Sequence, residues 1–152
     1  MTIQIGQEYM KPEGGIGKLA NYQDTQADTA AVGTTSVKFG QAVQVDEDVA
    51  GPLTAGGNLF GVAIAKDYVA EITAGAKTGT YKQYEALPVL RKGTIWVEVD
   101  EDVKSGQAAL ANTATGNFLP GTSVLETKTE KIGSFQSTAF AGDVAMLQIN
   151  LP

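Results

Sequence analysis

The side chains that could do chemistry together in this sequence are carboxylates, which gather in two Asp-Glu-Asp clusters at residues 46–48 and 100–102. Carboxylate oxygens suit a hard cation such as Ca²⁺, but neither cluster is followed by the glutamate at position twelve that completes an EF-hand loop. Paired catalytic carboxylates must face each other across a cleft, whereas neighbours on a turn point apart. A pairing of Asp48 with Asp102 stays open. We expect no metal site, and interpret both clusters as turns whose charge ends a strand and blocks edge-to-edge aggregation.

Other reactive side chains are missing. The chain contains no cysteine and no histidine, which removes the commonest thiol nucleophile, general base and metal ligand. The glycine-rich residues 14–17 lack the lysine-serine pair of a phosphate-binding loop, and the sequence has no nucleophile elbow. The sequence therefore predicts a protein that is not an enzyme and that needs no cofactor.

The charge of the chain also narrows its partners. Seventeen acidic and eleven basic side chains give a formal net charge of −6, which repels phosphate backbones. The longest uncharged apolar stretch, residues 59–65, is too short to cross a bilayer, and the amino terminus does not have the pattern of a signal peptide. We expect neither a nucleic acid nor a membrane as partner.

Strand patterns dominate the elements that position these side chains. Eighteen glycines separate short runs rich in Val, Ile, Phe and Thr, and no apolar period of 3.6 residues persists. The clearest strand is residues 94–99, which follows a turn at Gly93 and a strand at residues 87–90. It places Trp96 on the face opposite its core side chains, either at an interface or in further packing. Residues 144–151 predict a final strand tied into the sheet, and the fold class is all-β.

An internal echo links the two acidic clusters. Residues 43–49 recur almost unchanged as residues 97–103, and a glycine follows each copy, Gly51 or Gly106. This repetition predicts two strand, acidic turn and strand units that are built alike.

Residues 1–34 differ from the rest because they have too few apolar side chains for a core of their own. We expect them to form an extended amino-terminal arm, followed by one β domain at residues 35–152. Such an arm becomes ordered on a partner by adding a strand or by seating side chains in pockets. The predicted contact residues are Tyr9, Met10, Pro12, Ile16 and Tyr22.

The order of the motifs resembles the structural cement, or head decoration, proteins of tailed phages. The matching pieces are residues 12–19, 37–43, 60–64, 81–84, 87–99, 116–118 and 135–151. The resemblance implies a small β-barrel or β-tulip-like domain with an extended amino-terminal arm. It also implies a homotrimer on the outer capsid surface of the virion, with the major capsid protein as partner and synthesis in the host cytoplasm.

The function that follows is adhesion, by which the protein clamps neighbouring capsid subunits and stabilises the shell against internal DNA pressure. An alternative is a carbohydrate-binding or tail-fibre-type β adhesion module, for which Tyr68, Tyr81, Tyr84 and Trp96 are the candidate aromatic side chains. Residues 97–110 are also similar to the hairpin of biotinyl and lipoyl carrier domains, but they lack a lysine displayed at a tight hairpin tip.

Overall fold

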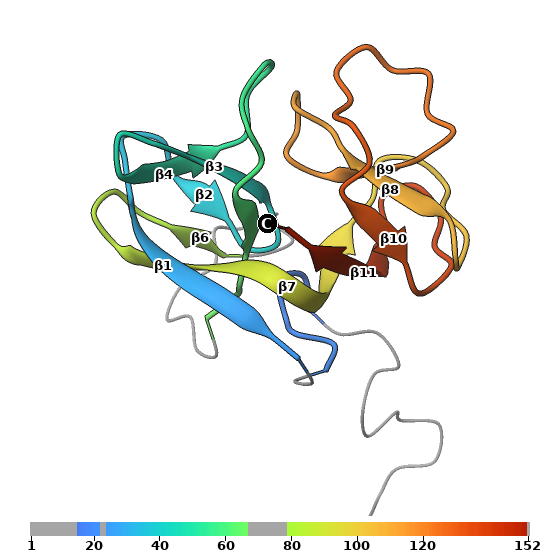
Figure 1. Ribbon diagram of the computed structural model, residues 1–152, viewed down its shortest axis with the longest axis horizontal. Helices are drawn as coiled ribbons and strands as arrows, with labels where there is room; N and C mark the ends of the chain where they lie inside the picture. The colour runs from blue at the N-terminus through green and yellow to red at the C-terminus, as the bar shows by residue number, and fades with distance from the viewer. Residues whose placement is uncertain (1–14, 22–23, 67–78, 152) are drawn as a thin grey trace, which may run out of the picture.

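The computed structural model describes residues 15–21, 24–66 and 79–151, and every element in them is a β-strand (Figure 1). The strands are β1 (Gln26–Val32), β2 (Val37–Lys38), β3 (Ala42–Asp46), β4 (Val49–Pro52), β5 (Gly61–Ala63), β6 (Thr80–Tyr81), β7 (Ala86–Glu98), β8 (Ala108–Ala111), β9 (Phe118–Pro120), β10 (Gly133–Phe135) and β11 (Val144–Asn150). None of the described residues forms a helix of the length and apolarity needed to cross a bilayer. The all-β prediction is confirmed.

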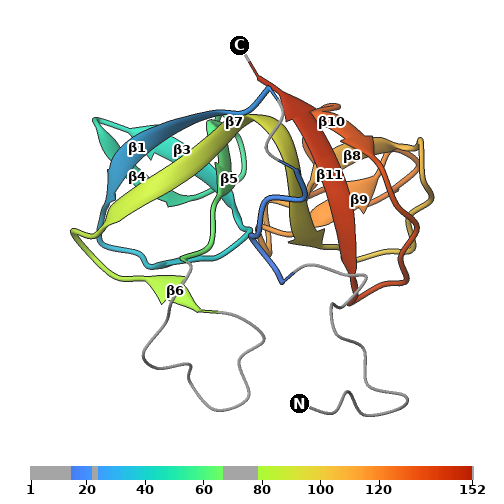
Figure 2. The same ribbon diagram turned by 90° about the horizontal axis from the view of Figure 1, so that it is seen from below.

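The strands form two lobes that share the long strand β7 (Figure 1, Figure 2). The first lobe holds β1 to β6 with the first half of β7, and the second holds β8 to β11 with its second half. β7 pairs with β1 and β5 up to Lys92, and with β11 from Lys92 onward. The two lobes are therefore joined by continuous sheet.

Strand pairing runs in a circuit in each lobe. In the first lobe the order is β1–β4–β3–β5–β7, and β7 pairs back with β1. In the second the order is β7–β11–β10–β8–β9, and Val99, directly after β7, bridges to Phe118 in β9. A barrel requires such circuits. The barrel or tulip form itself stays a prediction.

Two clusters of buried apolar side chains fill the lobes. One lies in the first lobe and includes Phe39 and Tyr81, whose rings meet edge to face at 5.2 Å. The other reaches from Val62 in β5 through Ile95 in β7 to Phe118 in the second lobe. Because the second cluster spans both lobes, they share part of their core.

β7 is longer than its sequence pattern indicates. The sequence predicts two strands separated by a turn at Gly93, but the structure has one strand of 13 residues. Gly93 has a φ of +139°, and a Cβ there would lie 3.2 Å from Thr25 Oγ1. Glycine lets the strand bend from one lobe into the other without ending. The predicted turn is therefore a bend within a strand.

The alternation predicted beyond this bend is confirmed. Ile95, Val97 and Val99 are fully buried, and Trp96 on the other face is half-buried. The last predicted strand is also confirmed, because β11 pairs with β7 along all seven of its residues.

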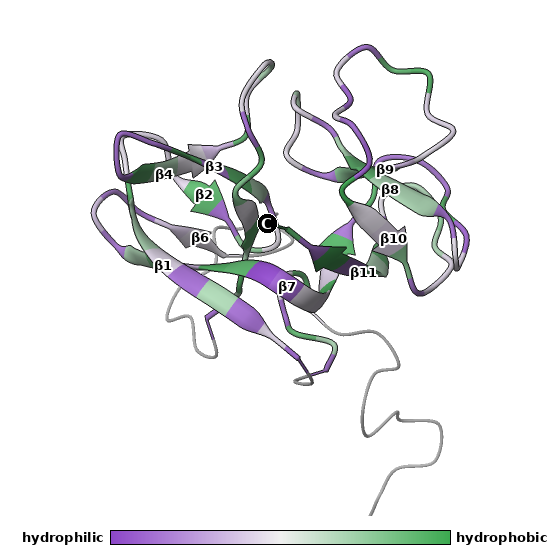
Figure 3. Ribbon diagram, in the orientation of Figure 1, coloured by the Kyte–Doolittle hydropathy of each residue, from purple (hydrophilic) through white to green (hydrophobic). Residues whose placement is uncertain are grey.

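β1 lies inside the span that the sequence assigns to the arm. Residues 26–31 pair with β7 in an antiparallel register, residues 31–32 pair with β4 in a parallel one, and Val32 is fully buried. Most of β1 is hydrophilic or weakly apolar (Figure 3), so its composition does not show that it belongs to the sheet. Backbone hydrogen bonds hold it there. The prediction of an extended arm therefore now concerns only the residues before Gln26.

The two echoed segments are not built alike, so that prediction is wrong. In the first copy, β3 and β4 form a hairpin whose turn residues Glu47 and Asp48 have φ values of +49° and +69°. In the second copy no hairpin forms, because Val99 bridges to β9 and Val103 bridges to Ala139. The two segments are alike in sequence over seven residues, but they pair with different strands. Pairing partners that lie far along the chain therefore decide the structure that each segment adopts.

Candidate functional site

Residues 15–20 form a strap that lies along the second half of β7, on the edge opposite β11. The Gly17 amide donates to the Trp96 carbonyl (2.7 Å), and the Trp96 amide donates to the Lys18 carbonyl (2.9 Å). The Ala20 amide donates to the Thr94 carbonyl (2.9 Å). These bonds run in an antiparallel sense, so the strap serves β7 as a neighbouring strand and covers an edge that would otherwise be open.

Two glycines allow the strap to come close to the first lobe. Gly17 and Gly40 have φ values of +83° and +72°, which glycine adopts without strain. A Cβ at Gly17 would lie 2.8 Å from the Gly40 amide nitrogen, and a Cβ at Gly40 would lie 2.7 Å from Ile16 Cγ2. Half-buried Ile16 therefore packs directly on the Gly40 backbone, and a side chain at either glycine would force the strap and the first lobe apart.

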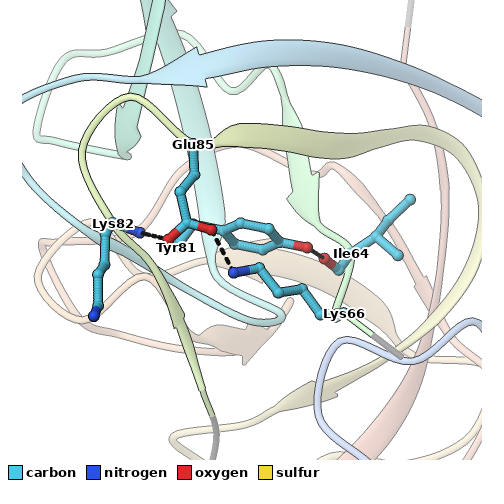
Figure 4. A network of polar contacts seen from close by, with 5 residues as sticks. All are labelled: Ile64, Lys66, Tyr81, Lys82 and Glu85. Atoms are coloured by element: carbon cyan, nitrogen blue, oxygen red, sulfur yellow. Dashed lines mark hydrogen bonds and ion pairs between the residues drawn. The ribbon is translucent and has the colours of Figure 1, made fainter. Parts of the chain in front are cut away.

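A polar network holds the two described ends of the chain around residues 67–78 (Figure 4). The Lys66 ammonium forms an ion pair with the Glu85 carboxylate and lies 4.9 Å from the centre of the Tyr81 ring. The Tyr81 hydroxyl donates to the Ile64 carbonyl, and the Lys82 amide donates to Glu85 Oε1 at 2.8 Å. The hydrogen bond from the Lys66 ammonium lowers the pKa of Glu85 most, and the hydrogen bond from the Lys82 amide lowers it further.

The strap and this network lie side by side. The Ala65 amide donates to the Gly17 carbonyl (2.8 Å), and the Lys18 ammonium approaches the Lys66 carbonyl at 3.5 Å. The described chain therefore leaves toward residue 14 and toward residue 67 from neighbouring positions (Figure 2). We call this region, made of residues 15–18 with Lys66 and Gly79, the strap end.

The second acidic cluster, residues 100–102, acts as a brace. Asp100 accepts hydrogen bonds from the side-chain amides of Asn112 and Asn117, both at 2.9 Å, and from the Thr115 hydroxyl at 2.6 Å. No group of three His, Cys, Asp or Glu side chains within the described ranges could hold a metal ion. The partners of Asp100 lie 12 to 17 residues away, so the sequence alone does not show this role.

The same cluster holds two further loops. Glu101 accepts a hydrogen bond from the Ser123 hydroxyl, and Asp102 accepts one from the Ala141 amide at 2.8 Å. Each carboxylate of the cluster thus fixes a different loop of the second lobe. The first cluster, by contrast, lies exposed at the tip of the β3–β4 hairpin.

The model of the family described as "Structural cement protein (E217 gp24/Pam3 gp6)" matches residues 3–150, which is nearly the whole chain. The chain belongs to the structural cement protein family. A comparison with curated protein sequences found no match.

Solved structures give a likeness in fold for this cement protein. A chain of the capsid of Myoviridae phage XM1 is 16% identical with a TM-score of 0.73, and the match covers 99% of this chain and 98% of that one. The head fiber gp8.5 N base of bacteriophage phi29 is 18% identical with a TM-score of 0.46, covering 83% and 94% of the two chains, and is too distant to carry an argument. At these identities the likeness to the XM1 chain shows the shared fold alone.

The sequence-predicted contact residues of this cement protein fall in different places. Ile16 lies in the strap, packed on Gly40. Four others lie outside the residues that the structure describes: Tyr9, Met10, Pro12 and Tyr22. Their contacts stay a prediction.

The aromatic side chains considered for carbohydrate binding do not gather on one described face. Tyr81 is buried with its hydroxyl bonded to the main chain, and Trp96 is half-buried beside the strap. Tyr84 is 81% exposed, and Tyr68 lies outside the described residues. The structure gives this alternative no support.

Sequence reasoning missed the exposed apolar side chains of the second lobe. Val124 is 88% exposed, Phe140 72% and Leu125 40%. The sequence gives one sign of them: they are bulky apolar residues within segments made mostly of Gly, Ser, Thr and charged residues.

Proposed function

We propose that this cement protein decorates the outer surface of a phage head, where it binds the major capsid protein and clamps neighbouring subunits against the pressure of packaged DNA. The family match over residues 3–150 carries this proposal, because it spans both lobes and the strap. In this proposal the protein is made in the host cytoplasm, and it acts by adhesion alone, without catalysis.

The clamp works by differential binding. A protein that binds only the mature arrangement of neighbouring subunits stabilises that arrangement by RT ln(1 + [L]/Kd), about 2.7 kcal/mol at a free concentration one hundred times Kd. The shared core and the continuous strand β7 support this role, since a clamp must not bend between its contacts. In the proposed form the protein is a small β-barrel or β-tulip-like domain. Three copies bind together on the shell, so that weak single contacts gain avidity.

The strap end supports an arm that binds the shell. The strap is fixed to β7 and to Ala65, so residues 1–14 start from a rigid position. In our proposal Tyr9, Met10 and Pro12 contact the shell from this segment, and Ile16 and Tyr22 extend the contact. An arm that becomes ordered on its partner covers a wide area at a cost in entropy.

The test is binding to heads prepared from a phage that lacks this gene, followed by cryo-electron microscopy of the heads with and without added protein. We expect co-sedimentation and added density on the outer surface. A folded protein that leaves the heads bare would contradict the proposal.

The arm is tested separately by deleting residues 1–14. A deletion of residues 1–30 would remove most of β1 and is unsuitable, since it would disturb the sheet. We expect the shorter deletion to keep the melting temperature within a few degrees and to lose affinity for heads. A full-length variant with Tyr9→Ser and Met10→Ser is the matched control for chain length. Undiminished binding by both variants would remove the arm from the mechanism.

A further inference from the structure

Three apolar side chains stand out on the surface of the second lobe. We call Val124, Leu125 and Phe140 the apolar rim. Val124 and Phe140 are 88% and 72% exposed, well above most apolar residues of the chain. A single exposed apolar side chain needs no explanation, but these three are carried by two loops of the same lobe, and exposed apolar groups of this kind are a mark of binding surfaces.

The loops that carry the rim are anchored at neighbouring residues of one turn. Ser123, next to Val124, donates to Glu101, and the amide of Ala141, next to Phe140, donates to Asp102. Each rim loop is therefore tied, one residue away from its exposed side chain, to adjacent positions of the acidic cluster.

Further bonds fix both loops. The Asp143 amide donates to the Phe140 carbonyl at 3.0 Å, and the Gly142 amide donates to the Val99 carbonyl at 2.7 Å. In the other loop, the Leu125 amide donates to Ser123 Oγ, and the Lys128 ammonium donates to the Ser123 carbonyl at 2.9 Å. Apolar groups on pre-ordered loops lose little entropy when they bind, which is the property of interface anchors.

The Phe140 turn lies at the same end of β7 as the start of the strap. The strap is antiparallel to β7, with Ala20 beside Thr94 and Gly17 beside Trp96, so residues 15 and 16 extend toward Glu98. β11 begins opposite Glu98, directly after the Phe140 turn (Figure 2). The start of the strap and the Phe140 turn therefore lie at the same end of β7.

The charge around the rim argues against a second copy of this chain as the occupant. Residues 100–104 and 121–143 carry six carboxylates and three lysines, a net charge of −3, and the whole chain carries −6. Two such surfaces repel each other. The rim suits a different protein, with an apolar pocket bordered by basic side chains.

We infer that the apolar rim is a docking surface for a capsid subunit, an inference that rests on the proposed function. Phe140 and Val124 are its anchors, and the acidic cluster at residues 100–102 positions them.

The experiment measures the affinity of four full-length variants for heads that lack the protein. Phe140→Ser and Val124→Ser remove the anchors. Tyr84→Ser and Val49→Ser are matched controls, because they remove an exposed tyrosine (81%) and an exposed valine (45%) from the first lobe. We expect each anchor variant to raise Kd about ten-fold or more and each control less than about two-fold, with all melting temperatures close to wild type.

The outcomes separate the possible failures. Wild-type protein that does not bind heads overturns the proposed function, and the docking surface with it. Wild-type binding with anchor variants that bind as well as the controls overturns the docking surface alone. Sedimentation of free protein tests the other occupant: if Phe140→Ser dissociates an oligomer while each copy keeps its affinity for heads, the rim joins copies of this chain and the capsid assignment is wrong.

Discussion

Replacing Gly17 by alanine should detach the strap, and its cost can be worked from the contacts. An alanine held at the φ of +83° costs about 1–2 kcal/mol, of which about 0.4–1 kcal/mol is offset by the stiffer unfolded chain. The added Cβ would also lie 2.8 Å from the Gly40 amide nitrogen and 3.0 Å from Phe39 Cβ. Such overpacking costs about 1–3 kcal/mol. The total is about 2–4 kcal/mol.

Gly56→Ala is the matched control. Gly56 has a nearly equal φ of +78°, but no atom lies within 4 Å of a Cβ built there. It therefore carries the backbone cost without the clash, about 1 kcal/mol or less. In thermal unfolding, where 1 kcal/mol corresponds to roughly 2–4 °C for a chain of this size, Gly17→Ala should lower Tm by roughly 5–15 °C and Gly56→Ala by no more than about 4 °C.

Hydrogen exchange locates the effect. The Trp96 amide donates to the Lys18 carbonyl, so it should exchange faster in Gly17→Ala if the strap has left β7. The Gly56→Ala variant should leave this amide protected. Equal Tm values for the two variants, or an unchanged Trp96 exchange rate, would refute the close packing of strap and first lobe.

Two further predictions concern carboxylates. Because its hydrogen bonds lower the pKa of Glu85, its folded pKa lies below the ordinary value of 4.5; the stabilisation is complete above 4.5 and is lost as pH falls through the lower, folded pKa. As pH falls below about 4.5, Tm should therefore drop more steeply in wild type than in Glu85→Gln, which lacks this carboxylate and is less stable at neutral pH, so the two Tm-against-pH curves should approach each other in acid. Curves that superimpose or stay parallel would contradict this. Asp100→Ala should cost about 2–4 kcal/mol in urea unfolding, because it leaves the buried Asn112 amide without its carboxylate partner. The echoed control Asp46→Ala, at an exposed position, should stay within about 0.5 kcal/mol, and equal costs would show that Asp100 is no brace.

The sequence predicts those elements whose signal is local. Alternation gives the strand around Ile95 and Val97, since every second side chain there meets the core. It does not give β1, whose side chains are small and polar and which is held by backbone pairing with β7 and β4. The echo fails for the same reason, because the fate of each copy depends on partners such as Ala139.

The candidate site was also predictable only where its signal is local. Carboxylates at residues 100–102 are visible in the sequence as a cluster, but their partners, from Asn112 to Ala141, lie 12 to 39 residues away and are brought together only by folding. Phe140 is visible as an isolated aromatic residue in a polar segment. That it is exposed and held in place is a property of the loop and not of the residue type.

The bend of β7 at Gly93 has a mechanical consequence. Because one strand runs through both lobes, a force that pulls them apart loads β7 along its length, and its pairs with β1 in the first lobe and with β11 in the second resist that force by shear. A peptide linker would instead stretch or swing under the same force. The molecule therefore transmits tension from one end to the other as a stiff bracket, and yields only when a lobe unfolds.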